Sequence, residues 1–318
     1  MEEAGIDAIV DLGGLTFVIE WKASSGLAQV SQAADNVRQH ASEMGKRAVP
    51  VLAVPFMGPL GRERCREAGV NWLDLSGNAH IVAPGVRVQI EGKPNLFKRR
   101  GRPSSAFAPK SSRIARWLLL NPGESMTQRE IARATDMDEG FTSRIVARLE
   151  EDELVVREPN GAIRARDPDL LLDAWREDYD FSKHEIVKGH VAARSGDALL
   201  RRVADQLRSM ETDYAATGMA AAWLLTRFAS FRTLATYVAE RPSSDLLDSM
   251  GFREKAHGAN VWLVVPADGG VFHGAGERDG VRCIHPVQAY LDLKGQPERA
   301  DEAATHLRAE LLTWCTDA

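Results

Sequence analysis

The first 97 residues alternate short apolar runs with longer amphipathic runs, which predicts a module of strands and helices. Short apolar runs bounded by Gly, Pro or Asn predict strands over residues 6–12, 15–22, 48–55, 71–75, 79–82 and 86–90. Apolar positions spaced three and four apart predict helices over about 31–44 and 62–68. We therefore expect residues 1–97 to form an α/β domain.

The remaining two thirds of the chain divide into three further segments by pattern. Residues 98–112, KRRGRPSSAFAPKSS, have no periodicity and the composition of a basic linker. Residues 113–180 predict helices followed by one hairpin. Residues 181–318 mix helices, expected over 197–210, 217–225 and 300–314, with short strands, expected over 233–238 and 259–265. The fold class expected is thus a multidomain chain that joins α/β and α+β parts.

Composition adds limits on location and partners. No run of about 18 apolar residues is present, so we expect no membrane span. The acidic start lacks a signal-peptide pattern, and Cys65, Cys283 and Cys315 form neither a metal spacing nor a disulfide framework. A cytoplasmic location is expected. The net charge is −5, yet residues 98–166 carry 14 Lys and Arg against 10 Asp and Glu, which favours a nucleic-acid partner.

Gly13-Gly14 separates two apolar runs and predicts a two-residue hairpin turn. Facing residues are then those whose numbers sum to 27, so Asp7 faces Glu20. Lys22 shares the face of Glu20 because side chains alternate along a strand. Two carboxylates about 5 Å apart repel each other unless a cation lies between them.

This arrangement resembles the PD-(D/E)xK nuclease-like superfamily, through Asp7, Glu20-Trp21-Lys22 and a following helix that carries glutamines. The resemblance implies a restriction-endonuclease-like fold over roughly residues 1–95. If it is an active nuclease, Asp7 and Glu20 would bind Mg²⁺ and Lys22 would orient a water or stabilise charge on a phosphate. The alternative is a surface Glu–Lys pair on an edge strand. Further along, Asp74, Ser76 and Asn78 form either a polar strand end or, as we expect, a turn between strands.

The stretch Met126-Thr-Gln-Arg-Glu-Ile131 predicts a helix start by two devices. Thr127 and Glu130 form a capping box, and Met126 with Ile131 forms a hydrophobic staple. A short helix over 128–135 is followed by a break and a second helix over about 141–152. On that second helix we expect an inward stripe, Phe141, Ile145, Val146 and Leu149, and an outward group, Ser143, Arg144 and Arg148.

Residues 154–166 predict a hairpin that turns at Asn160-Gly161 and carries Arg157, Arg164 and Arg166 on its strands. Three helices followed by a hairpin resemble the winged helix-turn-helix family of bacterial transcriptional regulators. The resemblance implies binding to double-stranded DNA, with Thr142, Ser143, Arg144 and Arg148 on the helix that enters the groove. The wing arginines would then contact phosphates. The alternatives are a solvated helix face and a protein-docking module.

Arg100-Gly-Arg102-Pro103 resembles the core of the AT-hook, in which an extended Arg-Gly-Arg lies in the minor groove. This resemblance implies that Arg100 and Arg102 contact DNA. The alternative is a basic flexible linker.

The C-terminal part, taken with the winged helix, resembles the AbiEi-type antitoxins of type IV toxin–antitoxin systems, anchored on Thr217-Gly218 and on Gln288 to Asp292. The resemblance implies a nucleotidyltransferase-like C-terminal domain and a cognate toxin as a partner. Catalysis would need a Gly-Ser turn and paired acids. Thr217-Gly218-Met219 has no serine and residues 233–238 have no acid pair, so we expect a non-catalytic scaffold.

Together these patterns predict a DNA-binding transcriptional regulator of the type IV antitoxin kind, without enzymatic activity or cofactor. Analogy with winged-helix regulators adds the expectation of a homodimer. The alternative is a Mg²⁺-dependent PD-(D/E)xK endonuclease targeted to DNA by the winged helix. A third hypothesis is a toxin-neutralising protein that acts without DNA.

Overall fold

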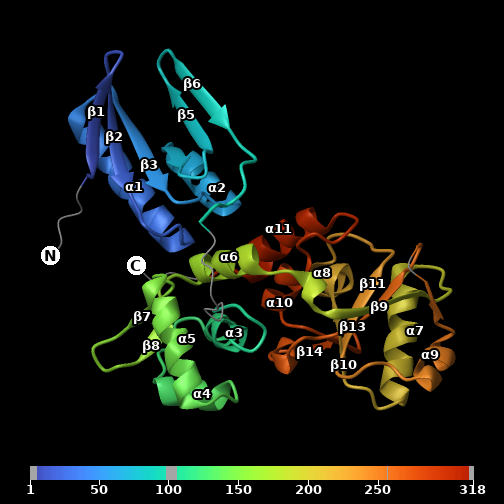
Figure 1. The fold of residues 1–318 in the computed structure, drawn as a ribbon. Coiled ribbons are helices and arrows are strands. Elements are labelled where there is room, and N and C mark those ends of the chain that lie inside the picture. The colour runs from blue at the N-terminus through green and yellow to red at the C-terminus, as the bar shows by residue number, and fades with distance from the viewer. Residues whose placement is uncertain (1–5, 98–105, 256, 315–318) are drawn as a thin grey trace. The chain divides into compact units, whose positions relative to one another are not determined.

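A computed structural model describes residues 6–97, 106–255 and 257–314 (Figure 1). By their internal contacts the residues form two compact units. One unit combines residues 1–105 with 146–177, and the other combines residues 106–145 with 178–318. Helix α5 (Glu139–Glu151) runs from the second unit into the first. Arg100 and Arg102 lie outside the described residues.

The N-terminal part of the first unit is a six-stranded sheet in chain order, β1 to β6. Its strands are Ala8–Leu12, Leu15–Trp21, Ala48–Val54, Asn71–Asp74, Ala79–Ala83 and Val86–Ile90. The middle strands β2, β3 and β4 run parallel, and β1, β5 and β6 pair antiparallel with their neighbours. All six strands that the sequence predicts are present, which confirms the α/β module.

Two helices pack on one face of this sheet. Helix α1 (Leu27–Met44) begins four residues before its predicted start, and α2 (Pro59–Ala68) begins at a proline, where the missing N–H costs nothing. Their apolar sides meet Val18, Leu52, Val54 and Trp72 from alternate positions of the strands. Because side chains alternate across a strand, this core uses one face of the sheet.

The first unit also contains the end of α5, a short hairpin and a helix. Strands β7 (Val155–Arg157) and β8 (Ile163–Ala165) pair antiparallel, and Gly161 in the connecting turn has φ +84°. Helix α6 (Pro168–Asp178) follows. Arg64 of α2 donates to the buried carboxylate of Asp173 on α6 at 3.1 Å, which fixes these two helices together.

The second unit begins with helices α3 (Ser112–Leu120) and α4 (Gln128–Ala134) and continues in a seven-stranded mixed sheet. The sheet order is β12-β9-β13-β11-β10-β15-β14. Its strands are Glu185–His190 (β9), Tyr214–Thr217 (β10), Leu234–Val238 (β11), Arg253–Glu254 (β12), Val261–Val265 (β13), Gly276–Arg278 (β14) and Val281–Cys283 (β15).

Helices flank this sheet in two groups (Figure 1). Helices α7 (Gly196–Ser209) and α9 (Ser244–Met250) pack together, and α8 (Gly218–Thr226), α10 (Pro286–Asp292) and α11 (Ala300–Leu311) form the other group. The sequence predicts α7, α8, α11, β11 and β13 but not β9, β10, β15, α9 or α10. Strand β10 is buried at every position, so it lacks the alternation by which a strand is recognised. Within the described ranges, no helix is long and apolar enough to cross a membrane.

Candidate nucleic-acid interface

The predicted helix-turn-helix is built from α4, a four-residue connection over 135–138, and α5. Thr127 Oγ1 accepts from Glu130 N at 3.3 Å, and Glu130 Oε2 accepts from Thr127 N at 2.8 Å, so the predicted capping box is confirmed. After α4, Asp136 takes a left-handed φ of +52°, which turns the chain sharply. Asp138 Oδ1 then accepts from Phe141 N at 2.7 Å and caps the first turn of α5.

The exposed side of α5 presents Ser143 and Arg144. The Arg144 guanidinium lies over the Phe141 ring at 5.7 Å, and Lys110 Nζ lies 6.0 Å from the same ring. Within the part of the chain that the structure describes, Arg144 makes no ion pair. A guanidinium held by an aromatic ring, with no carboxylate on it, keeps its donors available for a base edge or a phosphate.

Thr142 does not belong to this exposed group. It is fully buried, and its hydroxyl donates to Asp138 O at 2.9 Å. Positions 142, 145, 146 and 149 follow the i, i+3, i+4, i+7 spacing of a helical stripe, so Thr142 leads the inward face. The prediction that Ile145, Val146 and Leu149 point inward is confirmed, while Phe141 is only partly buried.

Among the described residues, the other four arginines predicted to contact DNA are each paired with carboxylates. Arg148 bonds to Glu151 at 2.7 Å and to Asp152 at 3.0 Å. The wing arginines pair in the same way: Arg157 with Glu150 at 2.9 Å, Arg164 with Glu158 at 3.2 Å, and Arg166 with Glu153 at 2.9 Å. These pairs are partly exposed and each is worth about 0–1 kcal/mol, so a phosphate can compete for the arginine.

Charge is balanced across this region in a way that the sequence prediction missed. Residues 103–166 carry 10 Lys and Arg and 10 Asp and Glu, so the whole excess of the basic segment resides in Lys98, Arg99, Arg100 and Arg102. The Glu150-Glu-Asp-Glu153 run supplies most of the carboxylates that bind the wing arginines. The predicted contacts also omit exposed cations of this region: Lys110, which stands two residues before α3, Arg133, in the last turn of α4, and Arg129, which pairs with Glu139.

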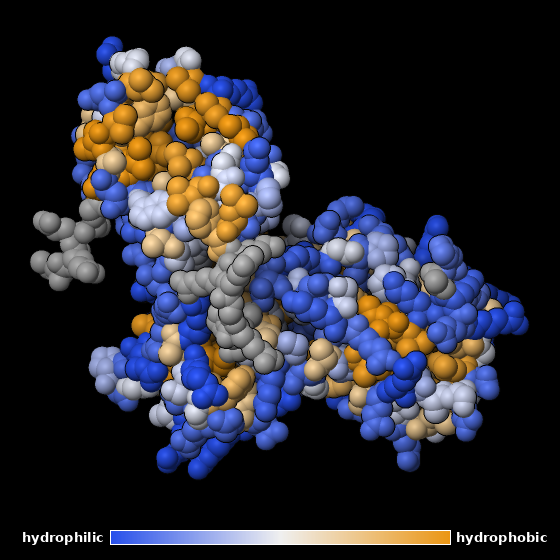
Figure 2. Space-filling view, in the orientation of Figure 1, coloured by the Kyte–Doolittle hydropathy of each residue, from blue (hydrophilic) through white to orange (hydrophobic). Residues whose placement is uncertain are grey.

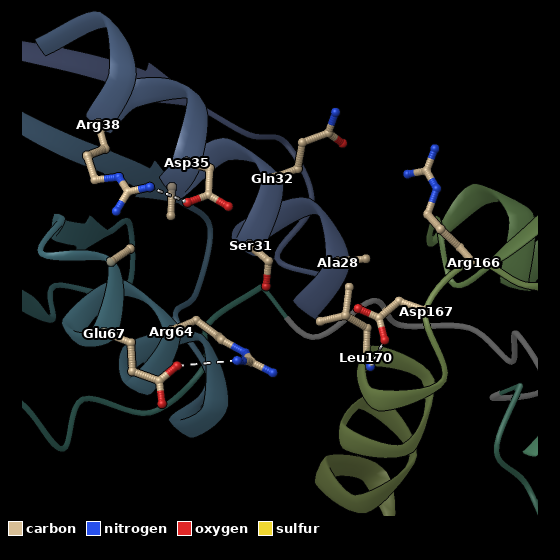
Figure 3. Close-up of a pocket in the computed structure, with 12 residues that line it drawn as sticks. Ala28, Ser31, Gln32, Asp35, Arg38, Arg64, Glu67, Arg166, Asp167 and Leu170 are labelled. Atoms are coloured by element: carbon tan, nitrogen blue, oxygen red, sulfur yellow. Dashed lines mark hydrogen bonds and ion pairs between the residues drawn. The ribbon is translucent and has the colours of Figure 1, made fainter. Parts of the chain in front are cut away.

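A polar pocket of about 630 Å³ lies in the first unit, between α1, α2 and the segment that leads from the wing into α6 (Figure 3). Arg38 pairs with Asp35 at 3.2 Å, and Arg64 pairs with Glu67 at 3.3 Å. Arg166 borders the pocket and pairs with Glu153. Since each of these arginines already has a carboxylate, the pocket has no excess of positive charge.

The N-terminal hairpin forms in the predicted register, with Val10 opposite Phe17 and Leu12 opposite Leu15. Glu20 is 3% exposed, and its Oε1 accepts from Lys22 Nζ at 2.9 Å. Asp7 Oδ2 accepts from Trp21 N at 2.7 Å. The charge of one carboxylate is thus balanced by Lys22, and the other is bound by a backbone amide, so the pair does not require a cation.

The polar group at the end of β4 is a turn, as expected. Both carboxylate oxygens of Asp74 accept hydrogen bonds, from Asn78 N and Nδ2 at 2.9 Å and from Met57 N at 3.1 Å. Gly77 in the turn has φ +93°. In the described parts of the chain, no group of three or more His, Cys, Asp or Glu side chains is arranged to hold a metal ion.

The second unit contains a buried polar cluster centred on Asp292 of α10. Its Oδ2 accepts from Thr217 Oγ1 at 2.5 Å, and its Oδ1 accepts from Gln288 Nε2 at 2.6 Å, from Tyr237 OH at 3.0 Å and from Tyr179 OH. Burial raises the pKa of Asp292 to about 6, although these hydrogen bonds act in the opposite direction. The two stretches on which the antitoxin resemblance rests, Thr217-Gly218 and Gln288 to Asp292, are therefore in direct contact through Thr217 and Asp292.

His184 joins the cluster from the other side of the tyrosines. Its Nδ1 accepts from Ala267 N at 3.0 Å, so the proton of the neutral ring lies on Nε2, which is 3.0 Å from Tyr179 OH and 3.2 Å from Tyr237 OH. Burial lowers the pKa of His184 to about 4, so the ring is neutral near pH 7.

Two arginines bind helix α3 to the C-terminal sheet and its helices within the second unit. Arg116 is buried and donates to Gln288 Oε1 at 2.5 Å, next to the Asp292 cluster. Arg113 forms a bidentate pair with Asp268, at 2.8 and 2.9 Å. Burial lowers the pKa of Arg116, and the hydrogen bond with Asp268 raises that of Arg113. The first helix of the winged-helix region is thereby fixed to residues near the C-terminus.

Two segments of the chain match known protein families. Residues 108–162 match the MarR family model, and residues 164–313 match a model described as "Transcriptional regulator, AbiEi antitoxin, Type IV TA system". Residues 1–107 lie outside both matches. Searches of curated proteins and of solved structures found no match.

The chain thus contains a MarR-type winged-helix region within a mixed α/β multidomain fold. With the AbiEi antitoxin match that follows it, this region supports a DNA-binding transcriptional regulator of the type IV antitoxin kind, as the sequence predicts. The nuclease alternative receives no support from either match.

Proposed function

We propose that this regulator reads duplex DNA by placing the exposed face of α5 in the major groove. The observation that carries the proposal is Arg144, an exposed guanidinium on the second helix of the helix-turn-helix, held by Phe141 and not by a carboxylate. Ser143 beside it offers a hydroxyl to a base edge or phosphate. Lys110 and Arg133 add cations for the DNA backbone.

The wing arginines contribute to DNA binding by exchanging their carboxylate partners for DNA phosphates. Arg157, Arg164 and Arg166 leave their glutamates when phosphate oxygens approach, and Arg148 does the same at the end of α5. Each exchange costs little because an exposed ion pair is weak. The net attraction to DNA then comes largely from the four cations of residues 98–102, with Arg100 and Arg102 in the minor groove.

The rest of the chain serves this DNA-binding role without chemistry of its own. We propose a nucleotidyltransferase-like C-terminal domain that is not catalytic, a cytoplasmic location, a homodimer that reads two half-sites, and a toxin protein as a further partner. No cofactor is needed for this function.

The N-terminal domain is proposed to be PD-(D/E)xK nuclease-like in fold. The support is a hairpin with Asp7, Glu20 and Lys22 at its end, followed by a helix and a parallel strand. Mg²⁺ at Asp7 and Glu20 would be required only by an active nuclease. Because Lys22 and the Trp21 amide already bind these two carboxylates, cleavage is not part of the proposed function.

The test is a gel shift of the purified full chain on the DNA upstream of its own gene. Wild type should shift the fragment, Arg144→Glu should not, and Arg194→Glu, an exposed arginine of the C-terminal part, should behave as wild type. Absence of a shift by wild type at low salt would refute the proposal. Binding of a toxin that survives Arg144→Glu, without any DNA shift, would favour the toxin-neutralising hypothesis instead.

A further inference from the structure

One face of the N-terminal sheet is apolar at nearly every position. The ladder register places on a single face the odd-numbered residues of β2 and β3 together with Val10 and Leu12 of β1. It adds Leu73 of β4, Ile81 of β5 and Ile90 of β6 to the same face. We call this surface the open face. None of its strand positions carries a charged residue.

Helices α1 and α2 pack on the opposite face, against Val18, Leu52 and Trp72. In the first unit, the described residues place no helix on the open face in the same way. Figure 2 shows a broad hydrophobic area over these strands. A sheet with parallel strands is normally covered on both faces, and among the described residues of the first unit only one face of this sheet is covered by helices.

The polar exception on this face, Asn71, has its hydrogen-bond partners within the sheet itself. Its side chain is 7% exposed, and both ends of its amide are hydrogen-bonded inside the sheet. Nδ2 donates to Pro50 O at 3.2 Å, and Oδ1 accepts from Val82 N at 2.7 Å. A partner that covers the face therefore leaves both ends of the Asn71 amide hydrogen-bonded.

The exposed apolar area is large for a surface with no partner. Leu12 is 67% exposed, Val10 44%, Ile90 43% and Val86, which pairs with Ala83 on this face, 37%. Leu15, Val49, Val51 and Ala53 of the same face are buried. With ~150–200 Å² for a fully exposed large side chain, these four side chains alone offer on the order of 300–400 Å², to which the partly buried side chains of the face add. One partner of a stable complex contributes about 800 Å², rim included.

A second copy of the chain suits this face better than a charged partner does. A twofold interface brings the same patch of each copy together, and two uncharged apolar faces meet without burying a charge. Sheets pack face to face at about 10 Å with their apolar side chains interdigitated. Strand β1 is the edge of the sheet, and all five of its residues are exposed, so the same contact would shield this edge.

We propose that two copies of this chain associate through the open faces of their N-terminal sheets. The proposal builds on the dimeric regulator proposed above and assigns its interface to the module that neither family match covers. The winged helices of the two copies would then read two half-sites.

The test is sedimentation velocity of the full chain without DNA, so that failure to bind DNA does not affect the result. Val10→Glu and Ile90→Glu place a charge on the open face. The matched controls are Ile9→Glu and Val82→Glu, which change neighbouring residues that are 54% and 52% exposed but point to the other face. Far-UV circular dichroism checks that each variant is folded.

Wild type should be a dimer at micromolar concentration. The two open-face variants should dissociate with a Kd at least tenfold higher, and the two controls should match wild type. A monomeric wild type, a dimer that survives Val10→Glu and Ile90→Glu, or equal dissociation of the controls would overturn the proposal. Hydrogen exchange of the wild-type chain gives an independent readout, since the amides of β1 and β2 should become better protected as concentration rises; no change would count against it.

Discussion

Arg157 on the wing and Glu150 at the end of α5 form a two-bonded ion pair, with Nε–Oε1 at 2.9 Å and Nη2–Oε2 at 3.2 Å. The cations of the wing are thus occupied by carboxylates of the same chain. In the proposed function, phosphate binding is a competition between these internal acids and the DNA backbone, so the acids are expected to weaken the affinity for DNA.

The first prediction follows from this competition. Glu150→Gln removes the charge that holds Arg157 and should tighten DNA binding by about two- to fivefold, the equivalent of up to about 1 kcal/mol. Fluorescence anisotropy on the upstream fragment at one fixed salt concentration measures the change. Glu240→Gln, an exposed acid of the C-terminal part, removes the same charge elsewhere and controls for net charge. An unchanged or weaker affinity for Glu150→Gln would show that Arg157 does not reach the DNA.

The second prediction concerns the charge excess of residues 98–102. Replacing Arg100 and Arg102 with Ala should reduce the slope of log Kobs against log salt by about 2, since each lost phosphate contact removes about 0.9. Affinity for A·T-rich fragments should fall more than affinity for G·C-rich fragments if the two arginines lie in the minor groove. A salt series on both fragments measures this, and an unchanged slope would exclude the segment from the interface.

Arg144 gives the third prediction, which concerns sequence readout. Arg144→Ala should weaken specific binding by about 1–3 kcal/mol and reduce discrimination among sites, while leaving non-specific binding nearly unchanged. Competition with unrelated DNA separates the two contributions. Arg194→Ala serves as the control. A uniform loss on every sequence would assign Arg144 to a phosphate instead of a base.

The fourth prediction uses the raised pKa of Asp292. In the unfolded chain this carboxyl has a pKa near 3.8, and in the folded chain near 6, so ionisation opposes folding. The penalty is absent below about pH 4, grows as pH rises to 6 and is then constant, at up to about 3 kcal/mol. Asp292→Asn removes it. The free energy of unfolding of the variant relative to wild type should therefore rise between pH 4 and pH 6.

Denaturant unfolding of both proteins at pH 4, 5, 6 and 7 measures this trend. Asn accepts fewer hydrogen bonds, so the variant is expected to be less stable in absolute terms; the test is the change with pH. The histidines are not altered, so the opposite contribution from His184, whose pKa is lowered to about 4, cancels in the difference. A difference independent of pH would mean that Asp292 is ionised in the same range in both states.

Local signals in the sequence predicted much of this molecule. The Gly13-Gly14 turn determined the hairpin register, and Thr127 with Glu130 marked the start of α4, because turns and caps depend on residues a few positions apart. Thr142 was placed on the wrong side of α5 because Phe141, a larger apolar residue next to it, suggested a different stripe.

Long-range pairing was less accessible. The Asp292 cluster joins residues from four separate segments of the chain. No spacing along the sequence predicts that Tyr179, Thr217, Tyr237 and Asp292 are in contact. The wing ion pairs could have been anticipated, since the acidic run 150–153 directly precedes the wing. The net charge summed over residues 98–166 does not reveal this run, because the four cations of residues 98–102 outweigh it.

The most direct test of DNA reading by this chain is a titration of the labelled upstream fragment with full-length wild type across a salt series. The account predicts binding at low salt that weakens steeply as salt rises, and loss of specific binding in Arg144→Glu at every salt concentration. Absence of wild-type binding at the lowest salt, or binding that Arg144→Glu leaves intact, would contradict it.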